Sequence, residues 1–242
     1  MKIIAKREAI LSPLQAVIGV VERKQTMPIL ANVLVAAKGG KLSITATDLE
    51  VELVATSEVD VQRGGEITIP GRKLLDICRA LPEGTEITLT QEGERMLVRA
   101  RKSRFTLTTL PAAEFPTVEE INAEQTLQLP QKDFKRLLDK THFSMAQQDV
   151  RYYLNGLLLE TSAKMLRAVA TDGHRLALCE VELANGGKAG QQVIVPRKGV
   201  LELQRILGNE DQLLEVSIGS NHLRVQIGDI RFTSKLIDGK FP

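Results

Sequence analysis

The feature that most constrains this sequence is an internal repeat with a period of about 126 residues. Four pairs of segments recur in the same order: ATDLE at 46–50 and ATDGH at 170–174, IPGRKLL at 69–75 and VPRKGVL at 195–201, RFTL at 104–107 and RFTS at 231–234, and EFP at 114–116 and KFP at 240–242. Such a period is far longer than a solenoid repeat and matches an independent domain. We therefore predict two copies of one domain, residues 1–117 and 118–242.

The joint between the copies is predicted at residues 111–120, which are acidic and bracketed by prolines, as linkers often are. The sequence ends at Pro242, the residue that closes the second copy. We expect a third repeat to be missing from this chain, and the repeat alone leaves open whether one was cut off or never existed.

Within each copy, alternating apolar residues predict antiparallel strands separated by glycine-rich turns. The clearest alternations cover residues 42–46, 87–90, 105–107, 166–170, 214–218 and 223–227. Helical spacing of apolar residues fits two segments per copy, at 10–21 and 74–81 and at 134–138 and 200–207. Pro13 either lies in the opening turn of the first helix or kinks it. The predicted fold class is α+β, with helices packed on one face of antiparallel sheets.

Composition excludes several classes of protein. Apolar residues make up 43% of the chain but aromatic residues only 3%, so the core must be built from Leu, Ile, Val and Ala. The same scarcity argues against a stacking platform for single-stranded nucleic acid. The first residues are too charged for a signal peptide, and no apolar run is long enough to span a membrane. Cys78 and Cys179 are interpreted as buried, reduced thiols, and we expect a cytoplasmic protein.

Positive charge is concentrated on the expected helices. Residues 6–24, 71–81, 131–142 and 197–207 each have a net charge of +2, although the whole chain is only +2. Solvent-exposed faces of helices commonly carry such charge. The same excess on equivalent helices of both copies nevertheless favours a surface that faces a polyanion and contacts phosphates without sequence preference.

No catalytic or metal-binding arrangement is evident. His174 lies near Asp172, but no nucleophile motif accompanies the pair, and the three histidines lack metal-ligand spacing. Asp48 and Asp172 are best explained as turn-capping residues. We therefore predict a protein that is not an enzyme and needs no cofactor. A nucleotide-using or DNA-modifying enzyme would need a phosphate loop, a metal cluster or an acid–base pair.

Several longer segments closely resemble the beta-subunit family of bacterial DNA polymerase III, the DNA sliding clamps. They are EGERMLVR at 92–99, FSMA at 143–146, DVRYYLNG at 149–156, TDGHRLA at 171–177 and VPRKG at 195–199. The resemblance extends from Met27 to the C-terminus. It implies tandem copies of the clamp domain, with sheets outside and two helices per copy facing a central pore. Chains of that family have three such repeats, and two chains close head to tail into a ring around duplex DNA.

The resemblance also implies site residues. Positions expected to contact DNA are Lys24, Arg72, Gln148, Tyr152, Tyr153, Arg197 and Lys198, of which position 24 is Lys where the family leads us to expect Arg. The pocket that takes short linear motifs of polymerases, the clamp loader and repair proteins is expected at Leu154, Thr171, Gly173, His174, Arg175, Leu176 and Pro242. Lys73, Arg104 and Phe105 match one side of the ring interface.

The implied function is that of a processivity factor that encircles double-stranded DNA and tethers replicative polymerase and other replication and repair proteins. The alternative is an adaptor, a pair of domains that binds peptides without encircling DNA.

Overall fold

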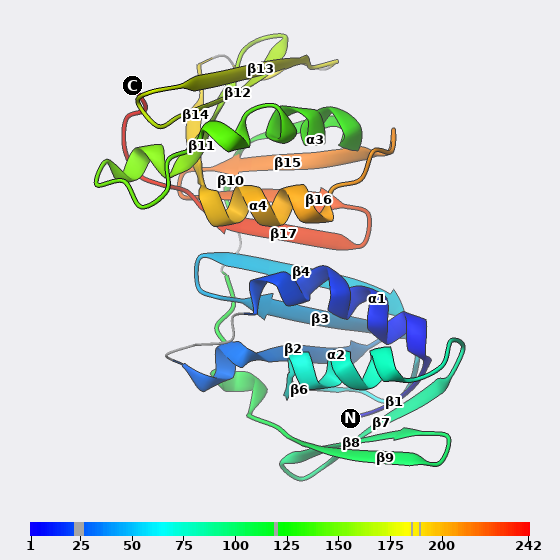
Figure 1. Ribbon diagram of the computed structural model, residues 1–242. Helices are drawn as coiled ribbons and strands as arrows, with labels where there is room; N and C mark the ends of the chain where they lie inside the picture. The colour runs from blue at the N-terminus through cyan, green and yellow to red at the C-terminus, as the bar shows by residue number, and fades with distance from the viewer. Residues whose placement is uncertain (22–26, 119–120, 185, 189) are drawn as a thin grey trace. The chain divides into compact units, whose positions relative to one another are not determined.

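The computed structural model describes residues 1–21, 27–118, 121–184, 186–188 and 190–242 (Figure 1). The chain separates into two compact units, Met1–Val118 and Glu119–Pro242, which we call the N-terminal and the C-terminal unit. In each unit, two helices lie side by side against antiparallel sheets (Figure 1).

The N-terminal unit has two antiparallel sheets, in the strand orders β5-β1-β7-β8-β9 and β4-β3-β2-β6. Its helices and strands are α1 (Arg7–Val17), α2 (Gly71–Ala80), β1 (Lys2–Lys6), β2 (Asn32–Lys38), β3 (Lys41–Thr47), β4 (Val51–Glu58), β5 (Asp60–Arg63), β6 (Gly65–Pro70), β7 (Glu86–Glu92), β8 (Arg95–Ala100) and β9 (Ser103–Thr108).

The C-terminal unit repeats this arrangement with the strand orders β10-β15-β16-β17 and β13-β12-β11-β14. Its elements are α3 (Gln131–Asp139), α4 (Arg197–Ile206), β10 (Ala123–Pro130), β11 (Gly156–Thr161), β12 (Met165–Thr171), β13 (Leu176–Glu182), β14 (Gln192–Pro196), β15 (Leu213–Gly219), β16 (His222–Ile227) and β17 (Ile230–Lys235). Apart from β5, each strand of one unit has a counterpart in the other, and each helix follows the corresponding strand. The predicted class, α+β with two α-helices per copy, is confirmed.

Burial explains why these segments form strands. In β3, Leu42, Ile44 and Ala46 are fully buried on the core face. On the other face Ser43 is half-buried and Thr45 is buried, so that face is also largely covered. Each predicted alternation coincides with a strand. The core is mostly aliphatic, as predicted, with Phe134 and Phe232 as its largest fully buried side chains.

Small residues let the second helix of each unit begin close to a sheet. A Cβ on Gly71 would lie 2.8 Å from Cγ1 of Val33, and one on Gly199 would lie 2.8 Å from Oγ of Ser234. Pro70 and Pro196 directly precede these helices. The first turns of α2 and α4 can therefore pack close to these strand residues only because glycine has no side chain.

Pro13 lies inside α1, beyond its first turn, which excludes the alternative that it opens the helix. A proline has no N–H to donate to the carbonyl four residues earlier. Here that carbonyl, on Ala9, accepts a hydrogen bond of 2.6 Å from the Ser57 hydroxyl of β4. A neighbouring strand thus supplies the hydrogen bond that Pro13 cannot make.

The repeated Phe-Pro segments anchor the end of each copy. Phe115 is buried against Ile29 and Leu30, and Phe241 is buried in a cluster with Leu154 and Ile194. The segment predicted as a linker is therefore partly packed onto the N-terminal unit.

The two cysteines differ in burial. Cys78 is buried in α2, where desolvation raises the pKa of its thiol to about 11. Cys179 is only half-buried, because β13 is an edge strand, so the expectation of two buried thiols is wrong for this residue. Both are free thiols. Within the described part of the chain, no helix combines the length and apolar character needed to cross a membrane.

Candidate functional site

The loop that precedes β11, residues 147–153, has a shape fixed by internal hydrogen bonds. The Asp149 N–H donates to Oδ1 of Asn155 at 2.9 Å, and Nδ2 of Asn155 donates back to the Asp149 carbonyl at 2.9 Å. Within the loop, Gln148 has a positive φ of 57° and is exposed. Tyr152 is 58% exposed and Tyr153 half-buried. The structure thus brings these three predicted DNA-contacting residues together on one loop.

The turn between β12 and β13, residues 171–176, is also held by hydrogen bonds between its own residues. Its Thr171 hydroxyl donates to the Arg175 carbonyl at 2.7 Å and accepts from the Gly173 N–H at 3.1 Å. Oδ1 of Asp172 accepts from the N–H groups of His174 and Arg175, and these hydrogen bonds lower the pKa of that carboxyl. The prediction that Asp172 caps a turn is confirmed.

Arg151 connects the loop to the turn. Its Nε and Nη2 donate to the two carboxylate oxygens of Asp149 at 3.0 and 2.8 Å. This pairing brings the pKa of Asp149 down to about 2. The same Nη2 donates to the Asp172 carbonyl at 3.3 Å. The guanidinium also lies against Gly173, where a Cβ would be 3.0 Å from Nη1.

An apolar cluster lies beneath these two segments. Ala146, Leu154, Leu158, Val169, Ile194 and Phe241 are buried together. Of the predicted pocket residues, Leu154 is therefore a core residue, and Pro242 is exposed directly after the buried Phe241. The structure thus brings together Leu154, the β12 strand that leads to Thr171, and the segment that ends at Pro242.

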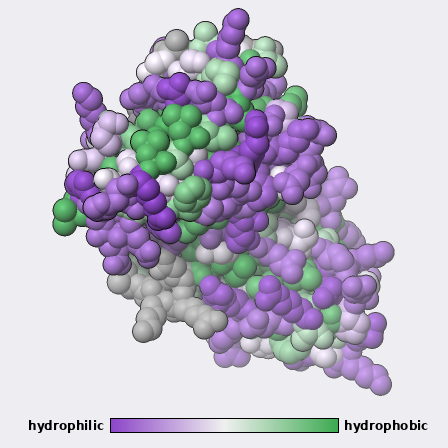
Figure 2. Space-filling view, turned by 45° about the horizontal axis from the view of Figure 1, so that its top comes forward, coloured by the Kyte–Doolittle hydropathy of each residue, from purple (hydrophilic) through white to green (hydrophobic). Residues whose placement is uncertain are grey.

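Several large apolar side chains of this unit are exposed. Leu176, the first residue of the edge strand β13, is 63% exposed, and Leu178, the third, is 52% exposed. Phe143 is 51% exposed. Figure 2 shows hydrophobic side chains gathered on part of an otherwise mainly hydrophilic surface. Such exposure is typical of a surface that contacts a partner.

A cleft of about 370 Å³ lies between the loop and the turn. Its lining consists of Phe143, Met145, Ala146, Gln147, Asp149, Asp172, His174, Arg175 and Arg197. The predicted peptide residues His174 and Arg175 thus share a cleft with Arg197, a predicted DNA contact.

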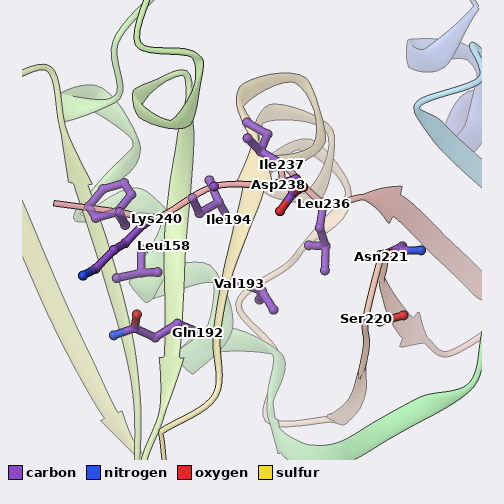
Figure 3. A pocket seen from close by; sticks show the side chains of 12 residues that line it. Leu158, Gln192, Val193, Ile194, Ser220, Asn221, Leu236, Ile237, Asp238 and Lys240 are labelled. Carbon is purple, nitrogen blue, oxygen red and sulfur yellow. The ribbon is translucent and has the colours of Figure 1, made fainter.

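A second hollow, also of about 370 Å³, lies between β14, the segment 236–241 and the β15–β16 hairpin (Figure 3). Its lining mixes apolar side chains such as Leu158 and Ile194 with Gln192, Asp238 and Lys240. None of the predicted site residues lines it, and this mixture favours no particular class of ligand.

The predicted basic residues on the helices differ in exposure. Arg72 is exposed at the second position of α2, and its Nη2 donates to the Val21 carbonyl. Arg197 and Lys198, the first residues of α4, are half-buried, and Arg197 donates to the Met145 carbonyl at 3.5 Å. Lys24 lies outside the described residues.

Carboxylates pair with much of the remaining helical charge. The pairs are Lys132–Asp211, Lys135–Asp139, Arg136–Asp133 and Arg205–Glu202. Arg7 is directed inward and donates to the Cys78 carbonyl at 2.7 Å. Asp133, Asp139 and Glu202 lie within the segments whose net charge was counted, so only Asp211 reduces the positive excess further.

Of the predicted ring-interface residues, Arg104 and Phe105 are neighbours on β9, whereas Lys73 is exposed on α2. Strand β9 is the last in the order of its sheet in the N-terminal unit. Arg104 is exposed and lies directly opposite Arg99 on β8. Like charges in this position destabilise a hairpin unless another surface compensates them.

Sequence reasoning missed Asp149, Arg151 and Asn155. The spacing of the Asp-Val-Arg segment at 149–151 indicates that Asp149 and Arg151 could pair. The hydrogen bond from Arg151 to the Asp172 carbonyl, however, depends on tertiary structure. Among the described residues, His, Cys, Asp and Glu do not gather in any group of three that could hold a metal ion.

Comparison with known proteins defines the class to which this fold belongs. Residues 1–119 match the family described as DNA polymerase III beta subunit, N-terminal domain, and residues 128–242 match its central domain. The fold is therefore that of a pair of clamp domains. The chain belongs to the DNA polymerase III beta-subunit family.

Relatives of the same family match nearly the whole chain. It is 53% identical to the beta sliding clamp of Escherichia coli K12, covering 100% of this chain and 66% of the relative. It is also 53% identical to the beta sliding clamp of Pseudomonas aeruginosa PAO1, covering 98% and 65%. The chain thus spans about two thirds of the length of these relatives.

Solved structures of beta subunits and sliding clamps have the same fold as this chain. The DNA polymerase III subunit beta of Pseudomonas aeruginosa superposes with a TM-score of 0.97 at 52% identity, covering 100% of this chain and 66% of that one. A sliding clamp from the same species bound to griselimycin gives 0.96 at 53% identity, with the same coverage. The sliding clamp of Caulobacter crescentus gives 0.94 at 38% identity, covering 100% and 67%.

Proposed function

We propose that this chain is part of a DNA sliding clamp, a ring that encircles duplex DNA and tethers polymerases and other replication and repair proteins to it. The ring would act in the cytoplasm by topology and binding, without catalysis. The observation that carries the proposal is the match of both duplicated units to the beta-subunit family. A clamp built from repeated domains needs the same secondary structure in each copy, and both units have it.

The proposed DNA surface is formed by the helices and the 147–153 loop. Lys24, Arg72, Arg197 and Lys198 would contact phosphates, and Gln148, Tyr152 and Tyr153 would contact DNA from the loop. Phosphate contacts made by basic side chains carry no sequence information and weaken with salt. Partial neutralisation of the helices by carboxylates suits a loose contact that permits sliding.

Charge reversal tests this surface. We expect Arg197→Glu and Lys198→Glu each to weaken binding to a random-sequence duplex and to flatten its salt dependence by about one unit of log slope per lost phosphate contact. Lys164→Glu, on the exposed turn between β11 and β12, is the matched control and should leave the slope unchanged. An unchanged slope in the two α4 variants would remove these residues from the DNA surface.

The proposed partner pocket consists of Leu154, the turn from Thr171 to Leu176, and Pro242. A short linear motif would place an apolar side chain over Leu176, which is too exposed to be part of the core of the unit. Crystal structures of related clamps from Pseudomonas aeruginosa and Bartonella birtlesii bound to griselimycin support a ligand site in this family. Griselimycin is therefore a suitable probe for this chain.

Truncation of exposed pocket residues tests that site. We expect His174→Ala and Leu176→Ala to weaken griselimycin binding while circular dichroism shows an intact fold. Leu213→Ala is the matched control, because Leu213 is also highly exposed in the same unit, on β15. Unchanged affinity in the first two variants would refute the assigned pocket.

The adaptor alternative is distinguished by the same variants. A domain pair that does not encircle DNA would bind peptide even if the chain had no measurable DNA affinity. Its peptide affinity would also be unchanged by the α4 substitutions. The observation that favours this alternative is that carboxylates pair with several basic side chains of the helices, which leaves fewer of them for phosphates.

A further inference from the structure

The N-terminal unit contains a counterpart of the turn that the proposed partner pocket uses. Strand β4 pairs with β3 so that Glu52 lies opposite Thr47. Strand β13 pairs with β12 in the same way, with Leu176 opposite Thr171. The two turns therefore place residues 52 and 176 at equivalent positions of the duplicated domain.

The apolar cluster beneath the turn is duplicated too. Leu30 and Phe115 are buried together in the N-terminal unit, as Leu154 and Phe241 are in the C-terminal unit. Each unit also has an isolated strand bridge beside its cluster, and these bridges join Thr68 to Leu110 and Ile194 to Ile237. By its framework alone, one chain thus offers a short linear motif two similar sites.

The two sites differ at the residue opposite the threonine. Leu176 is 63% exposed, whereas Glu52 is only 3% exposed. Oε2 of Glu52 accepts a hydrogen bond of 3.0 Å from the N–H of Val118, in the segment that follows Phe115. The carboxylate thus holds the backbone of its own chain at the place where the C-terminal unit exposes a leucine.

A buried carboxylate disfavours an apolar ligand at this position. Burial of a charged group costs free energy unless hydrogen bonds or an opposite charge compensate it. An apolar side chain of a motif would have to displace the Val118 backbone and would give the Glu52 carboxylate no hydrogen bond in return. Unfavourable groups of this kind allow a protein to reject a ligand at a site of suitable shape.

We propose that Glu52 closes the N-terminal counterpart of the partner pocket, so that a short linear motif binds only at the 171–176 turn of the C-terminal unit. The inference rests on the proposed function, because it assigns the motif to one of two duplicated sites. Glu52 is then a specificity-determining residue that acts by exclusion.

The test counts the griselimycin molecules bound per chain by isothermal titration calorimetry. We expect one for the unmodified chain and none for Leu176→Glu, which places a carboxylate in the C-terminal site. Glu52→Leu removes the acceptor of the Val118 N–H and supplies the missing leucine, so we expect the number to rise from one to two, with the added site the weaker. Glu58→Leu, the same change at the exposed end of β4, is the matched control and should stay at one.

A second readout uses the unmodified chain and so does not depend on the folding of a variant. Griselimycin should slow hydrogen exchange at residues 171–176 and leave residues 47–52 unchanged. Slower exchange at both turns, or two molecules per unmodified chain, would overturn the inference and leave the proposed pocket standing. A single site on a folded Glu52→Leu chain would do the same. Absence of binding by the unmodified chain would contradict the proposed pocket, and the inference fails with it.

Discussion

At the scale of single residues, the duplication is most exact in two turns. Asp48 repeats the role of Asp172, because its Oδ1 accepts from two backbone N–H groups at 2.9 and 2.7 Å. Thr47 repeats Thr171 by donating to the Val51 carbonyl at 3.0 Å. The sequence predicted the two aspartates as turn caps. It named Thr171 only as a pocket residue and did not single out Thr47, because the carbonyls that these hydroxyls bond lie four residues away.

The third residue of each turn has a positive φ, 78° at Leu49 and 87° at Gly173. A side chain in this conformation costs about 1–2 kcal/mol. We expect Gly173→Ala to lower the free energy of unfolding by about that amount, since its Cβ would also press on the Arg151 guanidinium. Leu49→Gly should change stability by less than about 1 kcal/mol, because relief of the strained φ offsets the entropy lost by glycine. Urea unfolding of both variants checks this, and an equal loss in both would contradict it.

We expect Asp149 to make the stability of the C-terminal unit depend on pH in the acid range. Its pKa is about 2 in the folded chain, below its ordinary value of 3.8. A depressed folded pKa contributes stability above the unfolded pKa, and this contribution is lost as pH falls from about 4 through about 2. We therefore expect Asp149→Asn to unfold with a weaker pH dependence over that window. Thermal melts at several pH values measure it, and parallel curves for both proteins would rule it out.

At the scale of elements, α1 contains a proline whose missing hydrogen bond is replaced from a strand. Removing the Ser57 hydroxyl leaves the Ala9 carbonyl without its donor, which costs about 1–3 kcal/mol for a buried acceptor and less for this half-buried one. In a Pro13→Ala background the helix N–H can reach Ala9, so Ser57→Ala should cost less there. A double-mutant cycle by urea unfolding should give a coupling above about 0.5 kcal/mol. Additive effects would show that the two features are independent.

The sequence allowed most elements to be predicted, because period-2 and helical patterns are local. The alternations predicted at residues 42–46 and 223–227 lie in β3 and β16. The four helices overlap the segments that apolar spacing predicted. The sequence left open whether Pro13 opens or kinks its helix, because the partner that compensates for it, Ser57, is distant in sequence. Arg7 was counted as surface charge although it points to the Cys78 carbonyl, and Arg151 was not singled out. Tertiary hydrogen bonds of this kind leave no periodic signal.

At the scale of the whole molecule, the N-terminal unit exposes an unusually basic edge. Residues 95–104 contain five basic residues and no acidic one, and Arg99 faces Arg104 across the β8–β9 hairpin. We propose that this edge, with Lys73 and Phe105, meets an acidic surface of another chain in the ring. Arg104→Glu should weaken assembly, most strongly at low salt. Sedimentation equilibrium measures this, with Lys41→Glu on the β2–β3 hairpin as control, and unchanged assembly of Arg104→Glu would exclude the edge.

The central claim is that the protein holds DNA by encircling it. The most direct measurement loads the assembled ring onto a nicked circular plasmid with a clamp loader and follows co-elution with the DNA by gel filtration, before and after a restriction enzyme linearises the plasmid. A sliding clamp stays on the circle and is lost from the linear form, because it slides off the ends. Equal retention on circular and linear DNA, or no retention on the circle, would contradict the proposed function.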